Sequence, residues 1–206
     1  MTDQEKDLRA RLVAAGVELV AREGIHALGL REIARQAGVS HGAPRRHFPT
    51  HRELLAAIAR HGFGRLTDTL AGADALAATT GAAPRTRLDA LARAYLGFAA
   101  ANPGMFELMF RHDLLEGSGA ELRHTTLPMF HTVARLVGEA RPESTDPGPA
   151  AAALWANLHG LAQLRAWGSL RLITGGEDVE PLLRAALDAH LGPVPGALPQ
   201  GAVTRP

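Results

Sequence analysis

The spacing of hydrophobic residues predicts helices along almost the whole chain. In the first segment, Leu8, Leu12 and Leu19 recur at intervals of four and seven residues, which places them on one face of a helix from about Asp7 to Glu23. Gly24 follows as the expected C-terminal cap. No segment alternates apolar and polar residues over the length of a strand. We therefore expect an all-α fold.

Two short helices joined by a glycine turn are expected next. The apolar residues of "LREIARQAG" share one face of a helix that Gly38 should end. Ser40 is a natural N-cap for a second short helix, which Phe48 and Pro49 close. Residues 7–48 therefore predict a helix followed by a helix-turn-helix unit.

Helical spacing continues to residue 191. Thr50 and Glu53 have the spacing of a capping box at the start of a long helix. We expect helices over about 51–70, 84–101, 121–140, 149–173 and 179–191, a short helix from Pro103, and a kink or interruption near Pro128. Small or turn-forming residues predict connections at 71–83 and 113–120, and residues 193–206 predict a disordered tail.

Composition and charge narrow the class of protein. The 206 residues are 46% hydrophobic and include no cysteine, so disulfides and thiol chemistry are excluded. Residues 1–62 hold ten Lys and Arg against seven Asp and Glu, a net charge of +3, and residues 63–206 hold twelve against fourteen, a net charge of −2. The polar start is unlike a signal peptide, and no apolar run reaches the roughly 18 residues that span a bilayer. We expect a cytoplasmic protein.

The segment "GVSHGAPRRHF", from Gly38 to Phe48, concentrates cations and small residues on the second short helix. Its small residues permit close approach to the major groove of DNA, and its arginines and histidines can reach phosphates. Phe48 should face inward, against Ile33 and Leu54. The side chains expected at DNA are Arg31, Ser40, His41, Gly42, Ala43, Arg45, Arg46, His47 and His51. Taken alone, the segment also fits an exposed cationic turn without a partner.

Residues 7–54 resemble the DNA-binding domain of the tetracycline-repressor (TetR) family of transcriptional regulators. The residues that carry the resemblance are Gly24, Ile33-Ala34, Ala37-Gly38-Val39-Ser40, Gly42 and His47-Phe48. The resemblance implies a homodimer with a helix-turn-helix DNA-binding domain over 1–54. It also implies a helical effector-binding and dimerisation domain over 55–192, whose last two long helices pair with those of the second copy.

Three positions depart from the family pattern. Gly29 stands where the family usually has Thr or Ser as a helix cap, Arg45 where it has Tyr, and His51 where it has Lys. Arginine can replace the phosphate contact of the tyrosine as a stronger, forked donor. A neutral histidine is a weaker phosphate partner than lysine. This suggests the hypothesis that DNA affinity falls as the pH rises through the histidine range.

The C-terminal half offers a second resemblance. "LWANLHGLAQL", with Trp155, His159 and Gly160, is similar to the Trp-His-Gly motif of one C-terminal domain class in the same family, as is "AYLGFAAANPGMFELMF". Trp155 and His159 are four residues apart and share a helix face. The candidate ligand-binding residues are Phe98, Met105, Phe106, Met109, Phe110, Met129, Phe130, Trp155 and His159. Ordinary core packing is the alternative for each methionine and phenylalanine.

The motifs of common enzyme classes are missing from the sequence. We find no Gly-rich phosphate loop, no Gly-x-Ser-x-Gly elbow and no His-Glu-x-x-His motif, so we expect no enzyme activity, cofactor or metal. The expected function is a repressor that binds a palindromic DNA operator as a homodimer and is released by a small molecule. The alternatives are a helical small-molecule-binding or interaction protein, or an unrecognised enzyme, without sequence-specific DNA binding.

Overall fold

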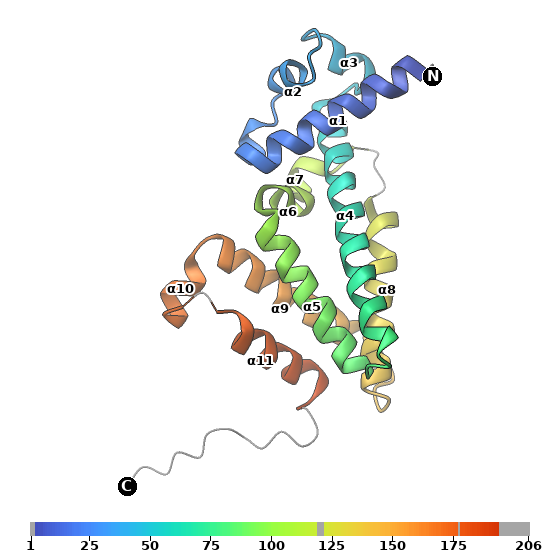
Figure 1. The fold of residues 1–206 in the computed structure, drawn as a ribbon, viewed down its shortest axis with the longest axis vertical. Coiled ribbons are helices and arrows are strands. Elements are labelled where there is room, and N and C mark those ends of the chain that lie inside the picture. Colours follow the sequence, from blue (N-terminus) through green and yellow to red (C-terminus); the bar gives the residue numbers. More distant parts are fainter. Residues whose placement is uncertain (1–2, 119–121, 177, 194–206) are drawn as a thin grey trace.

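A computed structural model describes residues 3–118, 122–176 and 178–193 of the chain, and these ranges contain helices and no strand. Three helices form a small head at one end of an elongated molecule, and the other helices form a larger body (Figure 1). The predicted all-α fold is confirmed. The sequence predicts the disordered tail over residues 193–206. Apart from Pro193, these residues lie outside the described part of the chain.

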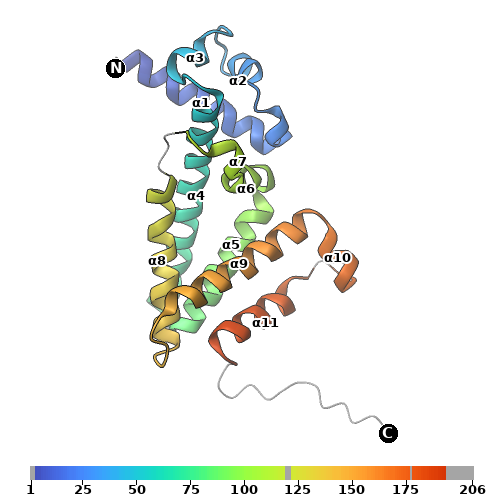
Figure 2. The same cartoon turned by 180° about the vertical axis from the view of Figure 1, so that it is seen from behind.

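The helices are numbered in chain order. The head consists of α1 (Asp3–Glu23), the 3₁₀ turn η1 (Ile25–Ala27), α2 (Leu30–Gln36) and α3 (Ala43–His47). The rest are α4 (His51–Thr79), α5 (Pro84–Ala101), α6 (Pro103–Phe110), α7 (His112–Leu115), α8 (Leu122–Ala140), α9 (Pro147–Ala166), α10 (Ser169–Thr174) and α11 (Glu180–Leu191). Figure 2 shows α4 beside α8 and α9 beside α11.

The head is built around side chains that no water reaches. Leu12, Ile33, Phe48 and Leu54 all have 0% exposed surface and lie in one apolar cluster. The inward packing predicted for Phe48 is therefore confirmed. Gly38, with φ of +67°, ends α2 as the sequence predicts, because a left-handed backbone suits glycine better than any other residue.

The start of α3 differs from the prediction. The N-cap is Gly42, with no side-chain cap, and Ser40 lies outside the helix. The Ala43 N–H donates to the backbone oxygen of Ser40, at 3.0 Å, and not to its hydroxyl. Pro44 stands in the first turn of α3, where its fixed φ suits a helix start and its missing N–H costs little.

The long helix α4 joins the head to the body. Thr50 accepts a hydrogen bond from the Glu53 N–H at 3.2 Å, which confirms Thr50 as the N-cap of the predicted capping box, and its hydroxyl lies 3.1 Å from the Glu53 carboxylate. The helix ends at Thr79, so much of the connection predicted at 71–83 is helical. Alanines favour the extension, and the Arg87 side chain of α5 holds Asp74 through two hydrogen bonds of 2.7 and 2.8 Å.

Three other boundaries in the body differ from the prediction. The helix expected over 149–173 is divided into α9 and α10, because Gly168 adopts φ of +71° between them. The turn expected over 113–120 includes the helical residues of α7. The helix α8 continues through Pro128 without the predicted interruption, and a kink at this position stays a prediction. Its predicted start, Glu121, lies outside the described residues.

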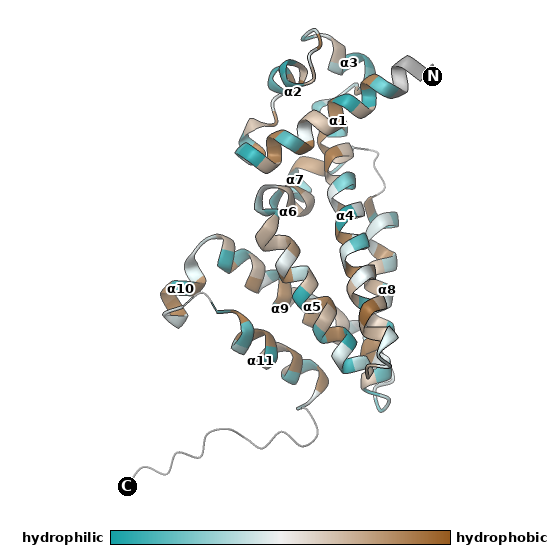
Figure 3. Cartoon of the chain, in the orientation of Figure 1, coloured by the Kyte–Doolittle hydropathy of each residue, from teal (hydrophilic) through white to brown (hydrophobic). Residues whose placement is uncertain are grey.

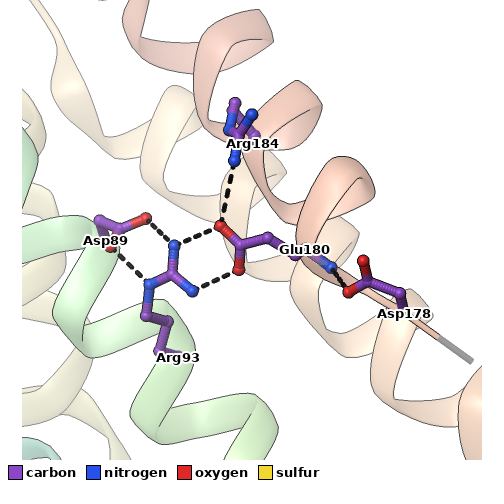
Figure 4. A network of polar contacts seen from close by, with 5 residues as sticks. All are labelled: Asp89, Arg93, Asp178, Glu180 and Arg184. Atoms are coloured by element: carbon purple, nitrogen blue, oxygen red, sulfur yellow. Dashed lines mark hydrogen bonds and ion pairs between the residues drawn. The ribbon is translucent and has the colours of Figure 1, made fainter.

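An ion network attaches α11 to α5 (Figure 4). Arg93 pairs with Glu180 of α11 and with Asp89 of its own helix, and its Nε lies 2.7 Å from Asp89 Oδ2. The hydrogen bond from Arg93 lowers the pKa of the Glu180 carboxyl. Arg184 adds a longer contact to Glu180, at 3.5 Å. The network is half exposed, so it orients α11 more than it stabilises the fold.

The close approach of α6 to α1 generates a prediction about stability. A Cβ at Gly104 would lie 2.5 Å from the carbonyl oxygen of Val20 and 3.1 Å from the Cα of Gly24. Because both atoms belong to the backbone, Gly104→Ala should lower the free energy of unfolding by about 1–3 kcal/mol, measured by urea denaturation.

Gly97→Ala is the matched control. Gly97 is exposed on α5, and a Cβ there would have no neighbour within 4 Å. This variant should be more stable than the wild type by about 1 kcal/mol, through helix propensity alone. If both variants changed the free energy of unfolding by the same amount, the close contact between Gly104 of α6 and the backbone of α1 would be contradicted.

Candidate DNA interface and effector site

The exposed tip of the head consists of α2, α3 and the turn between them (Figure 1). Most residues predicted to meet DNA are exposed there: Arg31, Ser40, His41, Gly42, Arg45 and Arg46. The three arginines have no hydrogen bond or ion pair to any described residue, whereas Arg9, Arg11 and Arg35 of the head are all bound to neighbours. The tip therefore carries three cations whose donors are available to phosphate groups.

Three of the predicted DNA-facing residues are less available. Ala43 is 9% exposed, so it packs into the head and does not lie on the exposed face predicted for it. His47 is partly buried. His51 has its Nε2 2.5 Å from the backbone oxygen of Leu28, to which a ring N–H donates. This bond occupies one nitrogen of His51, and the hypothesis of pH-dependent DNA affinity stays a prediction.

An aromatic cluster in the body connects α5, α6 and α9. The His159 ring stacks on Phe106, with ring centroids 5.3 Å apart and an interplanar angle of 29°. Phe110 meets the same imidazole edge to face at 4.6 Å, and Trp155 lies 5.5 Å from it. Three of the predicted ligand-binding residues therefore lie around the imidazole of a fourth, His159.

Tyr95 completes this cluster, and the sequence analysis did not assign it a role. Its hydroxyl lies 2.9 Å from His159 Nδ1, and its ring meets Phe106 edge to face at 5.5 Å. It is the single tyrosine of the chain, within the quoted segment "AYLGFAAANPGMFELMF". The sequence feature that could have identified Tyr95 as a site residue is its helical spacing from Phe98, combined with its polar hydroxyl.

Both polar groups at the centre of the cluster are neutral at pH 7. Burial lowers the pKa of the His159 imidazole, because the charged form loses its solvation. Burial also raises the pKa of the Tyr95 phenol, although a polar contact from Trp155 acts in the opposite direction. A neutral imidazole offers one donor and one acceptor. The site therefore presents hydrogen-bonding groups without charge, with the imidazole Nδ1 next to the Tyr95 hydroxyl and Nε2 at 3.5 Å from the Gln163 amide nitrogen.

The other predicted ligand-binding residues lie around this cluster or in the core. Phe98, Met105 and Met109 are buried. Met129 and Phe130 of α8 are partly buried and pack against the core. Trp155, in contrast, is 44% exposed. The described aromatic site therefore has a buried floor on α5 and α6 and a solvent-facing side at Trp155.

Three further features bear on what the described residues can do. An open groove of about 620 Å³ runs between α1 and α4, lined by Arg9, Ala10, Val13, Ala14, Val17, Glu18 and His61. Within the described ranges, no three His, Asp or Glu side chains lie close enough together to hold a metal ion. None of the helices in this part of the chain has an apolar stretch long enough to cross a membrane.

Two family comparisons match most of the chain. Residues 12–58 match the family described as "Bacterial regulatory proteins, tetR family". Residues 88–190, half of the 206-residue chain, match "Tetracyclin repressor-like, C-terminal domain". The first match covers the head from Leu12 onward and the start of α4, and the second covers the aromatic cluster. The narrower Trp-His-Gly class stays a prediction.

Individual proteins show the same similarity. The HTH-type transcriptional regulator BetI of Rhizobium meliloti is 40% identical over 86 residues, which are 41% of this chain and 40% of BetI. The HTH-type transcriptional activator FasR of Mycolicibacterium smegmatis is 34% identical over 106 residues, 51% of this chain and 46% of FasR. The matches thus span less than half of each curated relative.

One solved structure is similar over nearly the whole chain. A protein with unknown function from Rhodococcus sp. RHA1 is 32% identical, with a TM-score of 0.73, over 89% of this chain and 93% of that protein. The arrangement of head and body is therefore found in an experimental structure.

The lowered pKa of His159 predicts a contribution to the pH dependence of stability. The unfolded chain takes up a proton at the ordinary histidine pKa of 6.5, whereas the folded imidazole resists it. Folding stability should therefore fall as the pH drops below 6.5, and His159→Gln should reduce this fall. Urea midpoints between pH 7.5 and 5, measured for both proteins, give the comparison. Parallel curves would mean that the imidazole titrates normally in the folded protein.

Proposed function

Because the chain belongs to the TetR family of bacterial regulators, we propose that it is a ligand-responsive repressor that binds a palindromic operator as a homodimer. The observation that carries this proposal is the set of cations at the exposed tip, on Arg31, Arg45 and Arg46, which pair with no other residue in the described part of the chain. A helix-turn-helix head places one short helix in the major groove, and phosphate contacts from its flanks fix its register. We assign DNA binding to residues 1–54, effector binding and dimerisation to 55–192, and a cytoplasmic location to the whole.

The small size of α3 supports binding as a dimer. A helix of five residues reads few base pairs, whereas two copies related by symmetry read a palindrome with half-sites about one helical turn apart. We place the dimer contact on α9, α10 and α11. Trp167, Leu172 and Ile173 are 71%, 84% and 77% exposed there, and Figure 3 shows the hydrophobic colour of α10. A second copy would remove this apolar surface from water.

The aromatic cluster is the proposed effector site. A planar, uncharged ligand would enter at the exposed side of Trp155, stack on the rings and exchange a hydrogen bond with His159 or Tyr95. Phe106 and Phe110 belong to α6, which also touches α1 at Gly104 and α4 at Gly62. A ligand that moves α6 would therefore move both helices that carry the head. It releases DNA only if it binds the DNA-free state more tightly.

Selection of bound sequences from a random duplex pool, at two salt concentrations, tests the proposal. An enriched palindrome with half-sites about one turn apart is the expected result. Binding without enrichment, at any salt concentration, would contradict sequence-specific regulation and favour an interaction protein. A reporter under the selected operator then distinguishes repression from activation. The reporter matters because the relative FasR is named an activator.

The free arginines give a prediction about phosphate contacts. Arg45→Ala and Arg46→Ala should each weaken binding to the operator and to unrelated duplexes by a similar factor. Each should also reduce the slope of log affinity against log salt by about 1. Fluorescence anisotropy over a salt series measures both quantities. Arg65→Ala, on the exposed surface of α4 and outside the proposed dimer contact, is the control and should change neither. A loss confined to one operator position would make the arginine a base reader.

A further inference from the structure

We propose that Arg9 and Arg11 of α1 are positioning residues for DNA reading. They fix the angles of α3 and α2 without contacting DNA. The inference rests on the proposed DNA-binding function and adds to it a specificity device located outside the helix-turn-helix unit. In the head, α1 runs below both short helices, on the side away from the exposed tip (Figure 1), and one arginine reaches the C-terminal end of each.

Arg9 holds the end of α3. Its Nη1 donates to the backbone oxygen of His47, the last residue of α3, at 2.8 Å. The same guanidinium carbon lies 4.1 Å from the centre of the Phe48 ring, which is fully buried. The carbonyl end of a helix has unpaired acceptors and partial negative charge, so a cation there is stabilising. One side chain thus ties the last turn of α3 to the core of the head.

Arg11 holds the end of α2 in the same way. The N–H groups of Gly38 and Val39 donate to the oxygens of Arg35 and Ala34, the two hydrogen bonds of a Schellman motif. This motif does not use the carbonyl of Ala37, and Arg11 Nη2 donates to it at 2.9 Å. The arginine therefore binds at the start of the turn that sets the angle between α2 and α3.

The spacing of the two arginines suits this double attachment. Residues two apart on a helix are rotated by about 200° from each other, so side chains within a single turn can reach two different helices. A third contact on α1 supports the arrangement, because the Gln36 amide donates to the Glu18 carboxylate at 3.0 Å. Each contact joins α1 to the last residues of a short helix.

The short helix α3 depends on such contacts because it has little else to hold it. An isolated helix of five residues is not stable in water. Within α3 only Ala43 and Pro44 are buried, and both lie in its first turn. The last turn, with Arg45, Arg46 and His47, is held by the Phe48 anchor and by Arg9. A loss of Arg9 should therefore free the end of α3 that carries the phosphate-binding cations.

A positioning role differs measurably from a phosphate contact. Removing a phosphate contact weakens binding to every sequence and reduces the salt slope. Removing a positioning residue leaves all phosphate-binding charges present but misplaces the reading helix. The affinity for the operator should then fall more than the affinity for unrelated DNA. The ratio of the two affinities is the decisive quantity.

The experiment compares Arg9→Ala, Arg9→Lys and Arg11→Ala with Arg22→Ala, in the full chain. Arg22 is on α1 and pairs only with its neighbour Glu23 among the described residues, so it is the matched control. We expect Arg9→Ala and Arg11→Ala to weaken binding to the selected operator about tenfold, a cost comparable to one mismatched base pair. Affinity for an unrelated duplex and the salt slope should stay unchanged. Lysine cannot both stack on Phe48 and donate to the His47 oxygen as arginine does. The operator affinity of Arg9→Lys should therefore lie between those of the wild type and Arg9→Ala.

Equal losses on both duplexes with a smaller salt slope would overturn the proposal and make the arginines phosphate contacts. Unchanged operator affinity in all variants would overturn it as well. Amide hydrogen exchange gives a readout that needs no DNA: Arg9→Ala should speed exchange of the Phe48 N–H, which donates to Pro44. If the wild-type protein selects no operator, the proposed function fails. The exchange measurement still tests whether Arg9 holds the end of α3. Unchanged exchange would then refute it. Urea denaturation identifies any variant that is simply unfolded.

Discussion

The close packing of α6 between the head and the body is the contact on which the rest of the structure depends. It requires Gly104, because a Cβ there would meet the Val20 backbone, and it is eased by Gly62, where a Cβ would lie 2.6 Å from the Met105 sulfur and the methionine would have to shift. Without side chains at these two positions, α6 touches α1 and α4 at once. The head is therefore packed directly onto the body and does not hang from a flexible linker.

The same short helix contributes the rings that face His159. One side of α6 presents Phe106 and Phe110 to the imidazole, and the other presents Met105 and Met109 to α4. Methionine side chains adapt their shape more readily than branched ones. The two methionines can follow a small displacement of α6 without opening voids, so the contact with α4 persists while the helix moves.

The sequence predicted those features that depend on near neighbours in the chain. The capping box at Thr50, the turn at Gly38 and the burial of Phe48 follow from local chemistry and helical spacing. The extension of α4 to Thr79 depends on Arg87 of another helix, and the Arg9 contact to His47 joins residues 38 positions apart. Periodicity contains no information on such partners. It also could not separate the rings around His159 from the buried residues nearby.

The continuity of α4 has a mechanical consequence. Its 29 residues make a rod about 43 Å long, at 1.5 Å per residue. A tilt of about 5° at the body end would displace the other end by about 4 Å, more than the 3.4 Å between successive bases on a strand. In a symmetric pair the two displacements add. In the proposed dimer, a change too small to disturb the packing of one bundle would therefore shift the two heads out of register with the half-sites of a palindrome.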